Sequence, residues 1–240
     1  MLCKVCYNTV IDKSFFPHIC IMIIENNLLK NLFRNVYFVN GTAYAGKSTM
    51  VRRLAEKHDG ICCGENYHDA LMDLIDSSHQ PALSYFDTMS GWQEFISRTP
   101  EEYDAWFVNV GKEAAQLEVL MLIQLTQTGR KIFVDTNIGV DILKEISDFH
   151  HVAIMLSPQW TSVNQFFDRP DPEKQFLYQK LLEAPDPEAA IVNFRKCLEK
   201  INSQEHFDAF ANSGFYVQHR DDHRTVEESL SLLERHFKLK

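Results

Sequence analysis

The chain contains little basic charge and few of the residues that make fibrous or low-complexity sequences. Its 24 Lys and Arg residues are outnumbered by 33 Asp and Glu residues, which gives a formal net charge of −9. Because nucleic acids and anionic membranes are bound through basic surfaces, this balance argues against a nucleic-acid-binding or membrane-surface protein. Nine glycines and eight prolines in 240 residues are also too few for a fibrous or low-complexity chain. The overall charge leaves room for one local site that attracts an anion.

Long apolar segments and a disulfide framework are absent as well. The apolar stretch at 19–24 is far shorter than the roughly 20 residues that cross a bilayer, and no Ala-x-Ala cleavage pattern follows it. The six cysteines show no even, close spacing, which indicates a reduced, cytoplasmic protein. A second methionine, Met22, precedes the first well-defined element. We therefore expect residues 1–21 to be a peripheral extension, or to precede the true start at Met22, and residues 22–240 to form one domain.

Short apolar segments alternate with helical patterns along the chain. Segments rich in β-branched and aromatic residues predict strands at 36–40, 60–64, 131–135, 152–156 and 215–218. Alternation of this kind is typical of an α/β fold, in which a parallel sheet is covered by helices on both faces. The sequence therefore predicts an α/β domain with a five-stranded parallel sheet.

Two longer helical segments interrupt this alternation. Residues 66–130 are helical in pattern and separate the second strand from the third. Between the fourth and fifth strands, Pro-Asp-Pro-Glu occurs at 170–173 and again at 185–188. Asp is a favoured N-cap and Pro is favoured in the first helical turn, so each copy predicts a helix start. We therefore expect a helical insert over 66–130 and a helical arm over 158–203.

The segment Gly41–Ser48 reads Gly-Thr-Ala-Tyr-Ala-Gly-Lys-Ser and matches the pattern G-x-x-x-x-G-K-[ST] at every fixed position. It lies between a predicted strand and a predicted helix, as a phosphate-binding P-loop requires. The glycines allow backbone N–H groups to face an anion, and the helix N-terminus adds positive potential. The alternative is a glycine-rich turn that happens to precede a helix. The predicted contacts with ATP come from Gly41, Thr42, Ala43, Tyr44, Ala45, Gly46, Lys47, Ser48 and Thr49.

Two side chains of this pattern have defined chemistry in P-loop proteins. Lys47 would reach the β- and γ-phosphates, and the Ser48 hydroxyl would ligate Mg²⁺. Asp135 ends the apolar run 132–134, where an acid at the carboxyl edge of the sheet can hold Mg²⁺ or its water. We therefore predict a magnesium site made by Ser48 and Asp135. The alternative for Asp135 is an N-cap of the helix that begins near Gly139.

Other motifs of nucleotide-binding proteins are missing. There is no Asn-Lys-x-Asp, and no Gly stands three residues after Asp135, which argues against a GTPase switch. The dinucleotide fingerprint Gly-x-Gly-x-x-Gly is absent too. With its P-loop pattern, five strands, long insert and arm, the chain resembles the P-loop small-molecule kinases over about residues 36–220. This group holds nucleoside, nucleotide and shikimate kinases and antibiotic phosphotransferases, and the resemblance implies a three-layer α/β sandwich with sheet order 2-3-1-4-5, an acceptor site in the insert and a lid within the arm.

The resemblance also implies roles for three further residues. Glu65, at the end of the second strand, would lie near the acceptor hydroxyl and either take its proton or hold a metal-bound water. Arg169, at the start of the arm, would close from the lid and neutralise charge on the transferring phosphoryl group. Arg220, after the fifth strand, would flank the adenine. The alternatives are a solvated or N-cap role for Glu65 and a surface ion pair between Arg169 and Asp168 or Asp171.

The acceptor is expected to lack multiple negative charges. The Asp-Gly-x-Pro-Arg motif of nucleotide kinases is missing after the third strand, and Arg98 is the only Lys or Arg between residues 66 and 110. The aromatic residues of the insert could stack a flat ring, although a helical core is the simpler interpretation. A neutral or cationic alcohol, such as a nucleoside or an amino-sugar antibiotic, therefore fits better than a monophosphate. Further candidates are Asp69 as an alternative carboxylate and Lys174, Lys180 and Arg195 as alternative lid cations.

These observations together predict a Mg·ATP-dependent phosphotransferase, a kinase that acts on a hydroxyl of a small molecule. The predicted catalytic residues are Lys47, Glu65, Asp135 and Arg169, with ATP and Mg²⁺ as cofactors. Two alternatives stay open: a nucleoside monophosphate kinase, and a nucleotide-binding regulatory ATPase without a small-molecule acceptor. We expect no nucleic-acid or membrane partner, and a homodimer is left open.

Overall fold

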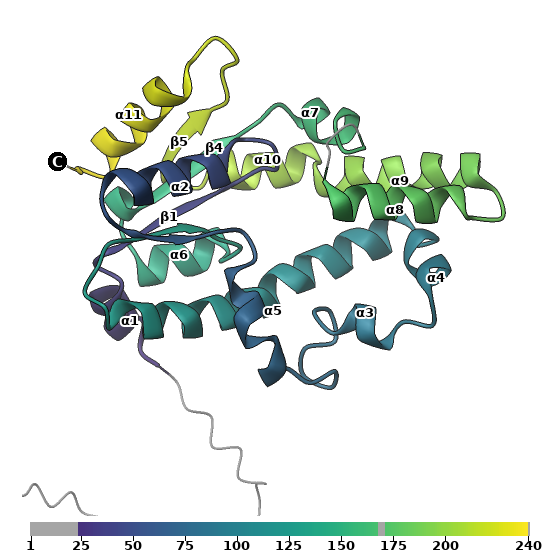
Figure 1. Cartoon of the computed structure of the whole chain (residues 1–240), viewed down its shortest axis with the longest axis horizontal. Coiled ribbons are helices and arrows are strands. Elements are labelled where there is room, and N and C mark those ends of the chain that lie inside the picture. The colour runs from purple at the N-terminus through teal and green to yellow at the C-terminus, as the bar shows by residue number, and fades with distance from the viewer. Residues whose placement is uncertain (1–23, 168–170, 240) are drawn as a thin grey trace, which may run out of the picture.

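The computed structural model describes residues 24–167 and 171–239. The predicted extension at 1–21 and the predicted lid residue Arg169 lie outside the described residues. The five strands are β1 (Val36–Gly41), β2 (Ile61–Cys63), β3 (Ile132–Asp135), β4 (Val152–Leu156) and β5 (Tyr216–His219). They form one parallel sheet in the order β2-β3-β1-β4-β5 (Figure 1). The predicted α/β class, the parallel sheet and the strand order are confirmed.

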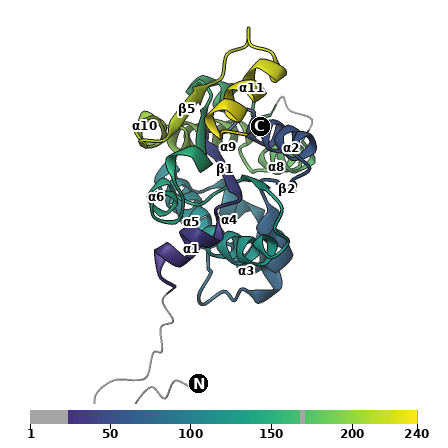
Figure 2. The same ribbon diagram turned by 90° about the vertical axis from the view of Figure 1, so that its left-hand side faces the viewer.

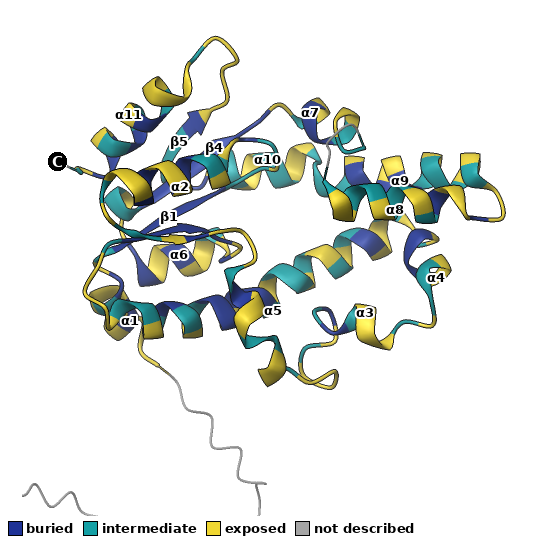
Figure 3. Cartoon of the chain, in the orientation of Figure 1, coloured by how far each residue is buried: buried dark blue, intermediate teal, exposed yellow. Residues whose placement is uncertain are grey.

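Helices cover both faces of this sheet. One face carries α2 (Lys47–Lys57) and α11 (Val226–His236), and the opposite face carries α1 (Asn26–Leu32), α5 (Pro100–Thr126), α6 (Val140–Ile146) and α10 (Gln204–Ala211). In Figure 2, α2 lies on one side of β1, and α6 and α10 lie on the other. Strands β1, β3 and β4 are therefore buried along nearly their whole length (Figure 3). Burial from both sides explains why their sequences are apolar up to Asn40 in β1, Asp135 in β3 and the end of β4.

The core of the first face shows why α2 and α11 pack there. Met50, Val51 and Leu54 of α2, together with Leu230 and Leu233 of α11, are buried against the sheet. These positions recur at helical spacing, so each helix buries one apolar stripe. The packing fixes the N-terminus of α2 close to the end of β1, and with it the loop that joins them.

The insert and the arm pack on each other beside the sheet. The insert contains a 3₁₀ helix (η1, Tyr67–Leu74), α3 (Tyr85–Thr88), α4 (Trp92–Ile96) and α5. The arm contains α7 (Gln159–Asn164), α8 (Pro172–Leu182) and α9 (Pro187–Ile201). Outside the insert and the arm, a short 3₁₀ helix (η2, Phe149–His151) precedes β4. Phe95 and Tyr103 of the insert share a core with Phe194 and Leu198 of the arm. We call α4, the first half of α5, α8 and α9 the helical lobe, which extends to the right in Figure 1.

Helix α5 connects this lobe to the sheet. It has 27 residues, and a capping box starts it: the Glu102 N–H donates to Thr99 Oγ1 at 3.2 Å, and the Thr99 N–H donates to Glu102 Oε2 at 2.8 Å. Its first half packs on α9 in the helical lobe, and its second half packs under the sheet. Among the described residues, no helix combines the length and the apolar character needed to cross a membrane.

Both Pro-Asp-Pro-Glu tetrapeptides begin helices, as the sequence predicts. The Glu173 N–H donates to the Asp171 side chain at 3.1 Å, and the Ala189 N–H donates to the Asp186 side chain at 3.0 Å. A proline follows each Asp as the first residue of α8 and of α9. The two caps satisfy N–H groups that would otherwise lack a partner at these helix ends.

Candidate functional site

The segment that we call the glycine loop, Gly41–Ser48, joins β1 to α2 under tight backbone constraints. Gly41 has a φ of +128° and Gly46 has a φ of +90°, a region that residues with a Cβ rarely adopt. A Cβ added to Gly41 would lie 2.0 Å from the carbonyl oxygen of Met155 on β4. The close approach of the two strands at this point therefore requires glycine.

Hydrogen bonds fix the glycine loop to the ends of the neighbouring strands. The Thr42 N–H donates to Met155 O at 3.0 Å, and the Ser157 N–H donates to Thr42 Oγ1 at 2.7 Å. On the other side, Asn40 Nδ2 donates to Ile138 O at 2.8 Å. The loop is thus held between the chain segments that follow β3 and β4.

Positive potential collects where the loop ends at the N-terminus of α2. The first N–H groups of a helix lack intrahelical partners, and the helix dipole is positive at this end. Gly46 is the N-cap and offers no side-chain acceptor to these groups. Lys47 Nζ lies nearby, where it donates to Thr42 O at 3.1 Å and lies 3.9 Å from Asp135 Oδ1. An anion inside the loop would therefore meet several N–H groups and one ammonium group.

Asp135 and Ser48 meet at the carboxyl edge of the sheet. Ser48 Oγ donates to Asp135 Oδ2 at 2.7 Å. Asp135 is 1% exposed, and burial raises the pKa of its carboxyl group, whereas Lys47 and the hydrogen bond from Ser48 lower it. The N-cap of α6 is Gly139, so Asp135 does not cap that helix. The structure brings the two predicted magnesium ligands into contact and contradicts the helix-cap alternative.

The glycine loop lines a pocket of about 780 Å³. Glu65, which follows β2, also lines this pocket and is exposed. It lies close enough to Asp135 for its charge to raise the pKa of that carboxyl group further. The loop after β5 supplies another part of the wall, including His219 and Arg220. The pocket thus brings Lys47 and Glu65 together, and Asp135 lies behind its wall, in contact with Ser48 and near Lys47.

Arg220 supports the glycine loop from the segment after β5. Its Nη1 donates to Tyr44 O at 2.9 Å, and its Nε donates to Asp222 Oδ1 at 2.8 Å. Its backbone N–H donates to Leu156 O at 2.6 Å and so continues the pairing of β5 with β4. The guanidinium group therefore holds loop backbone, and its predicted place beside an adenine stays a prediction.

The arm reaches the glycine loop through Lys174 of α8. Lys174 Nζ lies 5.1 Å from the centre of the Tyr44 ring and 3.6 Å from Asp171 Oδ2. The side chain also lines the pocket, whereas Lys180 and Arg195, the other two alternative lid cations, do not. The described part of the arm thus brings one lysine to the pocket.

The aromatic residues of the insert pack mainly against one another. Phe95 and Tyr103 are buried in the core of the helical lobe, which confirms the simpler interpretation for these two residues. The guanidinium of Arg98 lies 3.9 Å from the centre of the Tyr85 ring and 5.3 Å from that of Trp106. Arg98, the only Lys or Arg between residues 66 and 110, therefore contacts aromatic rings.

One buried acid, Glu118 of α5, was not predicted from the sequence. This side chain is 0% exposed and accepts hydrogen bonds from Thr136 and Asn137, the two residues that follow β3. It also accepts a hydrogen bond from the hydroxyl of Tyr67 in η1. The signal that could have revealed it is a single acid within the otherwise uncharged helical stretch 114–123.

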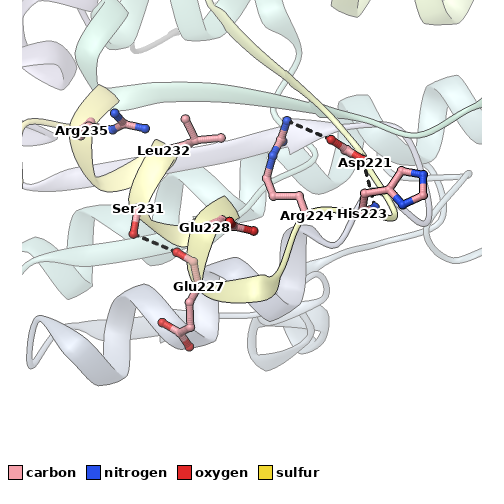
Figure 4. A pocket seen from close by; sticks show the side chains of 8 residues that line it. All are labelled: Asp221, His223, Arg224, Glu227, Glu228, Ser231, Leu232 and Arg235. Carbon is pink, nitrogen blue, oxygen red and sulfur yellow. Dashed lines mark hydrogen bonds and ion pairs between the residues drawn. The ribbon is translucent and has the colours of Figure 1, made fainter.

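A second hollow, of about 510 Å³, lies along α11 and shares Asp221 and Arg224 with the first pocket (Figure 4). Its polar groups pair locally: Arg224 Nη2 lies 3.6 Å from Asp221 Oδ2, and Ser231 Oγ donates to Glu227 O at 2.9 Å. Within 24–167 and 171–239, no group of three or more His, Cys, Asp or Glu side chains is arranged to hold a metal ion. The candidate chemistry is therefore centred on the glycine loop.

Comparisons of the chain with models of protein families, with curated proteins and with solved structures found no match. The residues of the glycine-loop pocket and their geometry are therefore the basis for a functional assignment. The central features of this site are a backbone loop at a helix N-terminus, the Lys47 ammonium group and, beside it, the buried Asp135 carboxylate.

Proposed function

We propose that the chain is a cytoplasmic P-loop phosphotransferase that moves the γ-phosphoryl group of Mg·ATP to a hydroxyl of a small molecule. The observation that carries this proposal is the meeting of Lys47, Ser48 and Asp135 at the N-terminus of α2. An ammonium, a hydroxyl and a carboxylate beside a glycine loop suit a triphosphate with its divalent cation. The positive potential of the loop N–H groups, the N-terminus of α2 and Lys47 supports phosphate binding in a chain whose net charge is −9.

The donor groups at this place fit a magnesium ion. Mg²⁺ prefers oxygen ligands, and in such sites one or two protein oxygens hold it together with phosphate oxygens and water. Ser48 Oγ and Asp135 Oδ2, which lie 2.7 Å apart, offer a hydroxyl and a carboxylate. Both residues would hold the ion, which when bound would neutralise charge on the β- and γ-phosphates. A nearby cation also favours the ionised form of a buried carboxyl group such as that of Asp135.

The remaining contacts with the triphosphate would come from the glycine loop and the arm. Lys47 would exchange its hydrogen bond to Thr42 O for contacts with the β- and γ-phosphates. Lys174, which lies against the Tyr44 ring, would add a second ammonium group from the arm. Arg169 keeps its proposed role as a lid cation and lies outside the described residues.

Glu65 would activate the acceptor hydroxyl. It lines the pocket and is exposed, so a bound alcohol can reach it. A carboxylate within hydrogen-bond distance of a hydroxyl can take its proton during transfer. The hydroxyl oxygen forms a bond to the γ-phosphorus, the bond from that phosphorus to the β,γ-bridging oxygen breaks, and ADP leaves. Glu65 then holds the proton until solvent removes it.

The charges of the insert favour a neutral or cationic acceptor. A monophosphate acceptor needs a cationic clamp, and the Arg98 guanidinium lies over the Tyr85 ring at 3.9 Å instead. Asp69 and Glu65 are exposed on the segment that follows β2. A nucleoside or an amino sugar therefore remains our preferred class of acceptor, ahead of a nucleoside monophosphate.

The test measures ADP formation from Mg·ATP with and without a panel of nucleosides, amino sugars and nucleoside monophosphates. We expect one of the neutral or cationic alcohols to stimulate turnover. In Lys47→Ala, turnover should fall by about 10²–10³-fold, because one charge-stabilising donor is lost, while the circular dichroism spectrum stays unchanged. The control is Arg53→Ala on the same helix, an exposed residue whose guanidinium lies 3.7 Å from Glu56, and it should retain turnover.

Each outcome of this assay separates the candidate functions. Stimulation by nucleoside monophosphates alone would favour a nucleoside monophosphate kinase. ATP hydrolysis that responds to no acceptor would favour a regulatory ATPase. Wild-type turnover in Lys47→Ala would overturn the proposed mechanism altogether.

A further inference from the structure

Glu118 is a fully buried acid that lies where α5 packs against the sheet. Its side chain is 0% exposed, and Ala115 and Leu122, which face the same core, are apolar. Burial of an ionised carboxylate is costly unless hydrogen bonds satisfy it. An apolar side chain would avoid that cost and fill the space. Packing alone therefore does not account for an acid at this position.

Four donor groups surround the Glu118 carboxylate. Oε2 accepts from Thr136 Oγ1 at 2.5 Å and from the Tyr67 hydroxyl at 3.2 Å, and Oε1 accepts from Asn137 Nδ2 at 2.9 Å. The Asn137 N–H lies 3.1 Å from both carboxylate oxygens. Burial raises the pKa of Glu118, and these hydrogen bonds lower it. Every one of these partners donates, so the ionised form of the acid is the one that suits them.

The donors belong to the two segments that carry the proposed acids of the site. Thr136 and Asn137 directly follow Asp135, and Tyr67 stands two residues after Glu65. Asn137 Nδ2 also donates to Glu65 O at 3.3 Å, which links the two segments directly. One carboxylate thus contacts the chain just beyond both acids.

The pairing of β2 with β3 does not reach both acids. It ends at Cys63 and Val134, ahead of Glu65 and Asp135. Beyond Cys63 and Val134, Glu118 connects the segment after β2 to the segment after β3. It accepts hydrogen bonds from Tyr67 of the first segment and from Thr136 and Asn137 of the second. Glu118 therefore bridges the two segments where the strands no longer pair, beside the direct hydrogen bond from Asn137 Nδ2 to Glu65 O.

We infer that Glu118 is a positioning residue that sets the distance between Asp135, the proposed magnesium ligand, and Glu65, the proposed base. This inference rests on the proposed function of the site. A residue of this kind acts through the groups that it holds in place. Loss of such a partner lowers activity or metal affinity by about 10- to 100-fold.

The test compares Glu118→Gln with Glu113→Gln on the same helix. Glu113 also accepts backbone N–H groups, those of Ala82 and Leu83 at 3.0 and 2.8 Å, but these belong to the insert and not to the segments of the two acids. For each protein we would measure kcat, KM for ATP, and nucleotide affinity by calorimetry across a range of Mg²⁺ concentrations. The calorimetry reads the magnesium site without any turnover.

Glu118→Gln replaces an acceptor oxygen with an NH₂ group that cannot accept from the surrounding donors. We expect it to lower kcat and to raise the Mg²⁺ concentration for half-maximal nucleotide affinity, each by about 10- to 100-fold. Nucleotide affinity without Mg²⁺ should stay unchanged, because the glycine loop is intact. Glu113→Gln should alter none of these quantities.

A second variant covers the case in which Glu118→Gln does not fold. Tyr67→Phe removes one donor and leaves the carboxylate in place, so it should show a smaller loss in the same two quantities. Wild-type values in a folded Glu118→Gln protein, equal losses in Glu113→Gln, or, if Glu118→Gln is unfolded, wild-type values in Tyr67→Phe would each overturn the inference. If no acceptor supports ADP formation in the wild type, the proposed function fails, while the calorimetry still decides the positioning role.

Discussion

At the scale of single residues, Gly41 is under the tightest steric constraint among the described glycines. Alanine at this position would place a Cβ 2.0 Å from Met155 O, with a backbone φ of +128°. We expect Gly41→Ala to lower the free energy of unfolding by at least about 1–3 kcal/mol, because β4 has to move to admit the methyl group. Urea denaturation measures this change.

The matched control for this substitution is Gly111→Ala in α5. An added Cβ at Gly111 meets nothing within 4 Å. Since alanine is the better helix former, this variant should gain up to about 1 kcal/mol. Changes of the same sign and size in the two variants would contradict the steric explanation for Gly41.

Lys174 is the arm residue whose removal should affect the proposed reaction. A charge-assisted hydrogen bond contributes about 1.5–3 kcal/mol, so Lys174→Ala should lower kcat/KM for ATP roughly 10- to 150-fold. Lys180→Ala serves as the control, because Lys180 lies on the same helix but pairs with Glu183 at 2.7 Å. Steady-state kinetics with the best acceptor measures both variants. Equal kcat/KM values in the two would remove Lys174 from the proposed site.

The residues of the candidate site differed in how far the sequence could predict them. Lys47 and Ser48 belong to one contiguous pattern, and Asp135 ends an apolar strand, so local sequence was enough to propose them. Glu118 and Lys174 reach the site only through the packing of α5 and α8. The sequence offered Lys174 as one of three alternative lid cations, and the single acid in the uncharged stretch 114–123 does not reveal what Glu118 contacts. Their partners follow only from the three-dimensional arrangement.

At the scale of elements, the N-cap of α9 offers a direct test of the repeated tetrapeptide. Asp186→Ala removes the acceptor of the Ala189 N–H, which lies 3.0 Å from the Asp186 side chain. We expect it to lower the free energy of unfolding by about 1 kcal/mol. Asp186→Asn should retain most of the stability, because Asn caps helices as well as Asp does. Chemical denaturation of both variants gives the answer, and an equal loss in both would argue against capping by the side-chain oxygen.

The sequence predicted the larger elements well and the small ones poorly. Apolar runs marked all five strands, and the two tetrapeptides marked the starts of α8 and α9. The division of the insert into η1, α3 and α4 was not predicted. Contacts among Tyr85, Trp92 and Phe95 hold α3 and α4 in place, and such contacts leave no periodic signal in helices of four or five residues.

At the scale of the whole molecule, His236 makes stability depend on pH. It is 8% exposed, stacks on Tyr216 with ring centres 4.4 Å apart, and donates from Nε2 to Val152 O at 2.8 Å. Burial lowers the pKa of His236 from 6.5, and His150 lowers it further, whereas the hydrogen bond to Val152 raises it. The folded protein therefore binds this proton more weakly than the unfolded chain, which takes it up below about pH 6.5. The stability contribution is fully present above that pH and is lost as the pH falls.

His236→Phe keeps a ring on Tyr216 but cannot take up a proton. Between about pH 5 and 6.5, the free energy of unfolding of the wild type should rise with pH more steeply than that of the variant. One proton corresponds to at most about 1.4 kcal/mol per pH unit. At neutral pH the variant should be less stable by about 1 kcal/mol, because Val152 O loses its donor. Parallel stability curves, measured by urea denaturation across this range, would show that His236 is not the group responsible.

The overall arrangement was predicted in part. The sheet order followed from the resemblance to P-loop kinases and is confirmed. The helical lobe was not expected as one unit, because the insert and the arm are far apart in the sequence. Asn193 Nδ2 donates to Arg98 O at 2.8 Å, and Phe194 contacts Tyr103, and these contacts form only when the two segments meet.

The sheet order also sets the sequence of events during synthesis. Strands β1 and β2 are made first, yet β3 lies between them, and Val36 of β1 pairs with Ile132. Until β3 has left the ribosome, the growing chain contains β1 and β2, which do not pair with each other. Pairing over such separations makes folding slow. The glycine loop can be fixed in place only later, because its hydrogen-bond partners Met155 and Ser157 belong to β4 and to the segment that follows it. Binding of a nucleotide to a nascent chain would therefore indicate that β4 has paired with β1 in the sheet.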